Sequence, residues 1–132
     1  MSCLLDTHAF LWAAFAPAKL SRKARATIAD GSVGVWLSPV SLWEISLKFA
    51  LGKLELKGCV PEDLVAVAAD MGLAVLPADA LEMASFHRLP RLPHKDPFDR
   101  MLVWQAIRRD LTLISKDGAL PDYRALGLKT LW

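Results

Sequence analysis

The chain has 132 residues, of which 54% are hydrophobic and 23% are charged, which excludes a disordered or low-complexity protein and predicts a single domain over residues 1–132. No apolar stretch approaches the roughly 20 residues that cross a bilayer, and no basic segment precedes an apolar core at the N-terminus, so we expect a cytoplasmic protein with no membrane partner. The net charge of +2 is too small to indicate nucleic-acid binding by itself.

The first half of the chain alternates strand patterns with helix patterns. The predicted strands cover residues 1–5 and 33–37, and the predicted helices cover residues 9–15, 21–29 and 38–51. The third helix begins at Ser38-Pro39, because serine is a good N-cap and proline at the first helical position loses no hydrogen bond. Cys3 falls in the first strand, where a buried thiol is more plausible than a disulfide or a zinc ligand.

The second half continues the alternation. The predicted helices cover residues 61–71, 78–89, 96–109 and 120–125, and the predicted strands cover residues 73–76, 111–114 and 128–132. A basic loop broken by prolines precedes the third of these helices. Because strands and helices alternate throughout, we expect a three-layer α/β domain with a mostly parallel sheet between helices.

Acidic residues fall near the carboxyl ends of the predicted strands. Asp6 follows the first strand, Asp117 follows the fourth, and Glu44 lies in the second turn of the helix after the second strand. Asp96 and Asp99 open the helix that leads into the fourth strand. Since right-handed crossovers bring these strand ends to one side of the sheet, we expect a carboxylate cluster there. Such a cluster needs a cation, and oxygen ligands suit Mg²⁺ or Mn²⁺.

Each acid also has a structural alternative that the sequence leaves open. Asp6 could cap the next helix, and Asp99 could favour the dipole of its own helix. Glu44 could form an ion pair with Lys48 one turn later. Asp117 precedes a glycine and could belong to an ordinary turn. Each acid alone is weak evidence for a metal site. Together they are stronger evidence, because several of them follow predicted strands.

Four segments carry the pattern of a known family. They are residues 4–12 (LLDTHAFLW), 41–45 (SLWEI), 96–102 (DPFDRML) and 113–117 (LISKD). In this order, and over nearly the whole chain, they resemble the PIN domain and specifically the VapC toxin of a type II toxin–antitoxin pair. The terminal Leu131-Trp132 matches one branch of that family.

The resemblance implies a PIN-like three-layer α/β/α sandwich that acts as a metal-dependent endoribonuclease and inhibits translation and growth. The four family acids correspond to Asp6, Glu44, Asp99 and Asp117. Asp6, Asp99 and Asp117 are expected to bind Mg²⁺ or Mn²⁺, with Glu44 acting through water. A bound divalent ion activates water and neutralises charge on a phosphodiester.

Other residues are expected to support this site. Asp96 is expected to cap its helix and to support the acids, together with Ser115 and Thr7. Basic residues that flank the acids are candidates for RNA phosphate binding, with solvated surface charge as the alternative; they are Arg91, Lys95, Arg100 and Lys116.

Histidine and tryptophan carry less information. A structural hydrogen bond is the preferred interpretation for His8. His87 and His94 fall in the loop region without the spacing of metal ligands. The five tryptophans are interpreted as core or interface residues in preference to base-stacking ones.

The resemblance also implies a small VapB-like antitoxin that binds the toxin in a hetero-oligomer. Apolar residues in the first and third predicted helices exceed what one core absorbs, which indicates an interface; they are Phe10, Trp12, Phe15, Trp43, Phe49 and Leu51. We therefore expect a homodimer and an antitoxin segment along these helices. A basic antitoxin side chain could enter the acidic cluster.

Three other functions are compatible with some of these residues. A haloacid-dehalogenase-like phosphatase needs a second aspartate two residues after Asp6, where this chain has His8. A response-regulator-like phosphoacceptor lacks its usual partner residues. A catalytically inactive domain that binds RNA or protein remains open, and the complete set of acids argues against it.

Overall fold

One parallel sheet forms the centre of the fold. The computed structural model describes residues 1–132, and its five strands lie in the order β3-β2-β1-β4-β5 with every neighbouring pair parallel. The strands are β1 (Ser2–Leu5), β2 (Gly34–Leu37), β3 (Ala74–Val75), β4 (Thr112–Ile114) and β5 (Lys129–Leu131). The predicted α/β fold is confirmed, and the sheet is entirely parallel.

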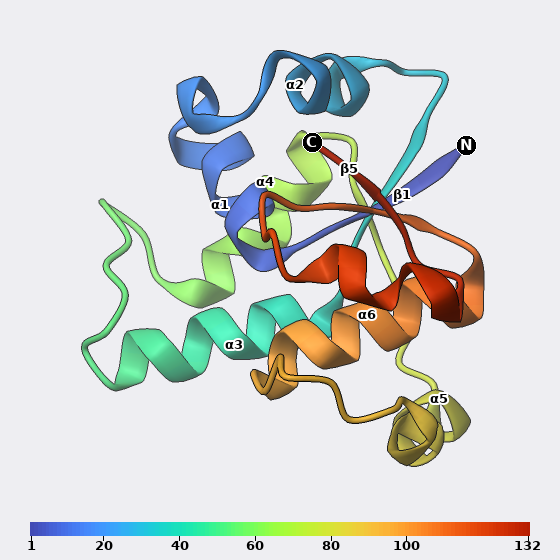
Figure 1. Ribbon diagram of the computed structural model, residues 1–132. Coiled ribbons are helices and arrows are strands. Elements are labelled where there is room, and N and C mark those ends of the chain that lie inside the picture. Colours follow the sequence, from blue (N-terminus) through green and yellow to red (C-terminus); the bar gives the residue numbers. More distant parts are fainter.

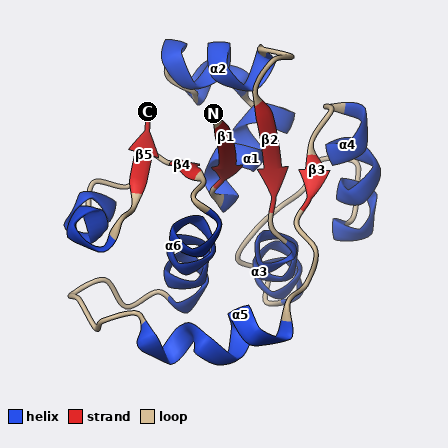
Figure 2. Ribbon diagram, turned by 90° about the vertical axis from the view of Figure 1, so that its right-hand side faces the viewer, coloured by secondary structure: helices blue, strands red, loops and turns tan.

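Helices cover both faces of the sheet (Figure 1). They are α1 (Thr7–Phe15), α2 (Arg22–Ala29), α3 (Pro39–Ala50), α4 (Leu64–Asp70), α5 (Ala80–Ala84) and α6 (Pro97–Arg109). Figure 2 shows α1 and α2 on one side of the strands and α3 and α6 on the other. This arrangement is the predicted three-layer α/β/α sandwich.

Alternate residues of β1 face the two layers. Cys3 and Leu5 are buried in a hydrophobic cluster with residues of α1, α2 and α4, whereas Leu4 is buried in a second cluster with residues of α6. Successive side chains of a strand point to opposite faces, so a strand covered on both sides is apolar throughout. Cys3 is a free, buried thiol, as predicted.

Several predicted helices differ from the observed ones at their ends. The first begins at Thr7, two residues early, because Asp6 caps it. Residues predicted as the start of the helix over 61–71 form a 3-10 turn, Pro61–Asp63. The helix predicted over 78–89 divides into α5 and a 3-10 turn, Ser85–Arg88, and Leu120–Leu126 is 3-10 throughout. These pieces are one or two turns long, a length at which i→i+3 hydrogen bonds are common.

A buried polar chain joins α3, α6 and α5. The hydroxyl of Ser38, which caps α3, donates to Gln105 Oε1 at 2.6 Å. Gln105 Nε2 donates to Glu82 Oε2 at 3.1 Å, and Arg109 Nε donates to Glu82 Oε1 at 2.8 Å. This chain fixes the start of α3 relative to α6, the two helices that carry Glu44 and the acids of the 96–102 segment.

Exposed apolar side chains gather on α1 and α3. Trp43 is 64% exposed, Leu51 at the end of α3 is 59% exposed, and Phe15 is 45% exposed. The interpretation of Phe10 as surface is wrong, because its side chain points from α1 into the core and is fully buried. None of the helices combines the length and the apolar character needed to cross a bilayer.

Candidate active site

Three of the predicted acids lie together beyond the carboxyl ends of β1 and β4. Asp6 directly follows β1, Asp117 lies three residues after β4, and Asp99 lies in the first turn of α6. All three line an open hollow of about 430 Å³, whose other lining residues are His8, Trp12 and Lys116. The topology therefore brings together carboxylates that are up to 111 positions apart in the chain.

Backbone amides hold two of these carboxylates. Asp6 Oδ1 accepts a hydrogen bond from the Ala9 amide at 2.6 Å, and Asp117 Oδ1 accepts one from the Ala119 amide at 2.9 Å. The Ser115 hydroxyl accepts from the Asp117 amide at 3.1 Å, which fixes the same turn. The cap and turn alternatives of the sequence are thus realised.

Asp96 holds the start of α6. Its Oδ1 accepts from the amides of Phe98 and Asp99, at 2.9 and 3.0 Å. It is the N-cap of the helix, as predicted, and it does not line the hollow. The cap orients the first turn of α6, and with it the side chain of Asp99.

Glu44 lies behind the hollow and does not line it. Its side chain is buried, with Thr7 Oγ1 donating to Oε1 at 2.6 Å and Lys48 Nζ donating to Oε2 at 2.5 Å. Glu44, Asp96 and Asp99 together raise the pKa of Lys48. Both oxygens of Glu44 therefore have protein partners, including the ion pair that the sequence left open.

His94 is the residue that the sequence analysis missed. Its Nε2 lies 3.2 Å from Asp99 Oδ2, and its Nδ1 lies 3.7 Å from Asp117 Oδ2. One ligand atom from each of these three residues lies within 4.8 Å of the others. His94 lies in a loop, as predicted, but its dismissal as a possible metal ligand is wrong, because this loop places its ring beside Asp99 and Asp117. Its position two residues before the Asp96 cap was the available signal.

Burial makes the carboxylates hard to ionise without a cation. Burial and the neighbouring Asp96 raise the pKa of Asp99 from 3.8 to about 6, against the lowering effect of the hydrogen bond with His94. Burial also raises the pKa of Asp6, against the Ser115 hydroxyl and the Ala9 amide. A cation bound between these groups would favour their ionised forms.

The candidate RNA-binding cations differ in their surroundings. Lys116 is exposed and lines the hollow. Arg91 and Lys95 are exposed on the loop before α6, outside the hollow. Arg100 Nη2 donates to the carbonyls of Leu89 and Pro90, at 3.1 and 3.2 Å, so its guanidinium holds that loop.

The His8 side chain makes no hydrogen bond to another residue, contrary to the preferred interpretation. Its side chain is exposed at the hollow, and its ring lies against Trp12 with 5.8 Å between the centroids. His8 is the second residue of α1, two positions after the cap Asp6, and its exposed side chain lies beside the acids.

Comparisons with known proteins agree with the architecture. The family model of the PIN domain matches residues 3–126. No curated protein matches the chain in sequence. A chain of VapBC2 from Rickettsia felis, solved with a DNA fragment from its promoter, has a TM-score of 0.66 and 14% identity, with 99% of this chain and 98% of that chain covered.

Two further solved structures are similar in the same way. VapBC-5, a toxin–antitoxin system from Mycobacterium tuberculosis, has a TM-score of 0.53 and 18% identity over 98% of this chain and 95% of that one. FitAcB from Neisseria gonorrhoeae has a TM-score of 0.54 and 15% identity over 100% and 97%. At these identities the similarity is one of fold.

Proposed function

This chain belongs to the PIN domain family, and from that premise we propose that it is a metal-dependent endoribonuclease, the VapC-like toxin of a type II toxin–antitoxin module acting in the cytoplasm. The observation that carries the proposal is the convergence of Asp6, Asp99 and Asp117 on one open hollow, with His94 in contact with two of them. RNA is the proposed substrate because the family resemblance of the sequence implies it.

The donor set fits a hard divalent cation. Three of the six side chains that line the hollow are carboxylates, and none of the three forms an ion pair with a lysine or an arginine. Carboxylate oxygens suit Mg²⁺ and Mn²⁺. Asp6, Asp99 and Asp117 would hold the ion, and Glu44 would act through water.

Other residues of the chain position the carboxylates and bind the phosphate. A divalent ion, when bound, supplies an activated water and neutralises charge on the phosphodiester. The backbone amides at Asp6 and Asp117 keep those carboxylates in fixed positions, and His94 orients Asp99 from the other side. Lys48 forms an ion pair with Glu44, and Lys116 provides a positive charge for a phosphate at the rim of the hollow.

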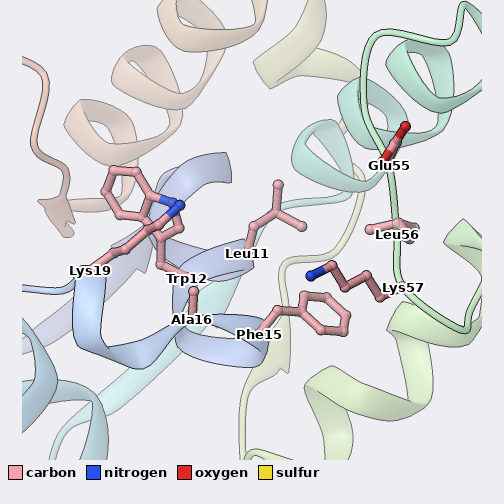
Figure 3. Close-up of a pocket in the computed structure, with 8 residues that line it drawn as sticks. All are labelled: Leu11, Trp12, Phe15, Ala16, Lys19, Glu55, Leu56 and Lys57. Atoms are coloured by element: carbon pink, nitrogen blue, oxygen red, sulfur yellow. The ribbon is translucent and has the colours of Figure 1, made fainter.

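We propose that an antitoxin segment binds in an apolar groove beside α1 (Figure 3). It measures about 480 Å³, and its lining residues are Leu11, Trp12, Phe15, Ala16, Lys19, Glu55, Leu56 and Lys57. Figure 3 shows Leu11 and Phe15 of α1 on the side of Leu56 and Lys57, which belong to the loop after α3. A VapB-like segment with apolar side chains would bury this groove.

The exposed face of α3 around Trp43 is proposed as the homodimer contact.

Cleavage of RNA tests the enzymatic proposal. We expect the purified protein to cut RNA in Mg²⁺ or Mn²⁺, to lose activity in EDTA and to regain it when metal returns. Asp6→Asn should lose at least about 100-fold in rate, and the exposed Asp122→Asn should behave as wild type. Cleavage that persists in EDTA would refute metal dependence. RNA binding without cleavage under any metal would support the inactive binding module.

Co-expression tests the partner. The protein alone should arrest growth, and the product of a neighbouring gene should relieve the arrest and co-purify with it. A charged substitution in the groove, Phe15→Glu, should abolish co-purification, because it places a carboxylate in an apolar contact. Growth arrest that the neighbouring gene product does not relieve would contradict the antitoxin proposal.

A further inference from the structure

An aromatic and basic rim borders the acidic hollow. Trp12, His8 and Lys116 line it together with Asp6, Asp99 and Asp117. The His8 and Trp12 rings are tilted by 47° with 5.8 Å between their centroids, and Lys116 Nζ lies 5.9 Å from the centroid of the Trp12 ring. An indole face, a second ring and a cation thus lie beside the carboxylates, and none of the three is part of the proposed metal site.

We propose that this rim is a nucleotide-binding subsite, in which the Trp12 indole stacks on one unpaired base of the RNA and Lys116 binds an adjacent phosphate. The inference rests on the proposed function, since it places the substrate of that same hollow. It makes the enzyme selective for single-stranded RNA, because a base within a duplex has both faces covered by its neighbours.

The stacking residue is held rigidly relative to the carboxylates. Asp6 caps α1, and His8 and Trp12 follow one turn apart on that helix, so that they share one face. Trp12 also packs against Trp132, with 5.8 Å between the ring centroids and 59° between the planes. A base that stacks on Trp12 would therefore have a fixed position relative to Asp6.

The size of the hollow and the charge of Lys116 at its rim suit a nucleotide. The hollow of about 430 Å³ falls within the range of about 300–1,000 Å³ that is typical of small-molecule sites. Stacking on an indole tolerates any base, because every base has a π face. Lys116 is exposed, so its ammonium can reach a phosphate outside the ring.

The test compares variants of Trp12 on one short RNA. The substrate is a single-stranded oligonucleotide that the wild type cuts in Mn²⁺, offered also as a duplex with its complement. Trp12→Leu should raise KM about 5- to 100-fold with little change in kcat, because it removes stacking and keeps the metal site. Trp12→Phe keeps an aromatic face and should recover part of that loss. The duplex should be cut far more slowly than the single strand.

Matched controls separate stacking from general damage. Leu81→Ala removes an exposed large apolar side chain of α5, outside the hollow, and should leave KM unchanged. Lys116→Gln should weaken binding and lower the salt dependence by about one counterion, whereas Lys23→Gln on α2 should not. Melting temperatures confirm that each variant is folded.

The outcomes distinguish the subsite from the nuclease. If the wild type cuts RNA and Trp12→Leu keeps the wild-type KM, the subsite is refuted and the nuclease stands. If no metal supports cleavage, the same oligonucleotide is titrated in Mn²⁺ by fluorescence anisotropy. A Trp12-dependent Kd then supports the subsite without the nuclease, and equal Kd values for wild type and Trp12→Leu refute it.

Discussion

Replacing Asp99 by asparagine is expected to stabilise the metal-free protein. Burial and Asp96 raise the pKa of Asp99 from 3.8 to about 6, so the fold disfavours its ionised form. One pKa unit corresponds to about 1.4 kcal/mol, which gives an upper bound of about 3 kcal/mol at neutral pH. Because the side chain is 31% exposed, solvent screening reduces this to about 1–2 kcal/mol.

A second contribution opposes the gain. Asp99 lies in the first turn of α6, where a negative charge is favourable by about 0.3–1 kcal/mol. The net stabilisation should be about 1 kcal/mol, which corresponds to a rise of roughly 3–5 °C in melting temperature. The cap is untouched, because Asp96 accepts from the backbone amide of Asp99.

The contribution of Asp99 to the free energy of unfolding depends on pH, and its sign follows from the direction of the pKa shift. Between about pH 4 and 6 the folded protein binds a proton at Asp99 more tightly than the unfolded chain does, so this group lowers stability as pH rises through that window. The advantage of the variant should be complete at about pH 7 and roughly halved at about pH 5.

Thermal unfolding in EDTA, followed by circular dichroism, measures both values. Asp122→Asn serves as the control for a generic loss of one exposed carboxylate. A melting temperature of Asp99→Asn at or below that of wild type at neutral pH, or an advantage independent of pH, would refute the reasoning.

Three further outcomes are expected. Mg²⁺ or Mn²⁺ should raise the melting temperature of the wild type with increasing concentration, and Asp6→Asn should lose most of that rise in differential scanning fluorimetry. Asp96→Ala should cost about 1 kcal/mol in urea unfolding by removal of the cap, whereas Asp96→Asn should cost much less, because asparagine also caps helices. Arg109→Met leaves the buried carboxylate of Glu82 without its cation and should cost about 3–5 kcal/mol, and adding Glu82→Gln should recover part of the loss.

The fold followed from local signals that the structure realises in place. Ser38 caps α3, Asp96 caps α6, and the apolar residues of β1 are buried on both faces. Strands and helices alternate along the chain, and connections between parallel strands are right-handed, so few chain topologies were compatible with the sequence. The main departures are the short segments in which 3-10 and α bonding compete, and the start of α1, which lies two residues before the predicted one.

The positions of site residues that follow strands could be predicted from the sequence. The positions of residues carried by loops could not. Asp6 and Asp117 meet because β1 and β4 are neighbours. No periodic pattern constrains the loop that carries His94, so its position two residues before the Asp96 cap was the one sequence signal for its contact with Asp99. The same holds for Arg100, whose long side chain bonds to the carbonyls of residues ten and eleven positions earlier.

One indole forms part of two walls, since Trp12 lines both the apolar groove and the acidic hollow. Occupants of the two cavities therefore contact the same side chain, and an occupant that shifts the ring changes the affinity of the other cavity. Thermodynamic linkage makes that coupling equal in both directions. If the proposed function holds, a protein bound in the groove would lower the affinity of the hollow for RNA without placing any group among the carboxylates, and RNA in the hollow would weaken the binding of that protein to the same extent.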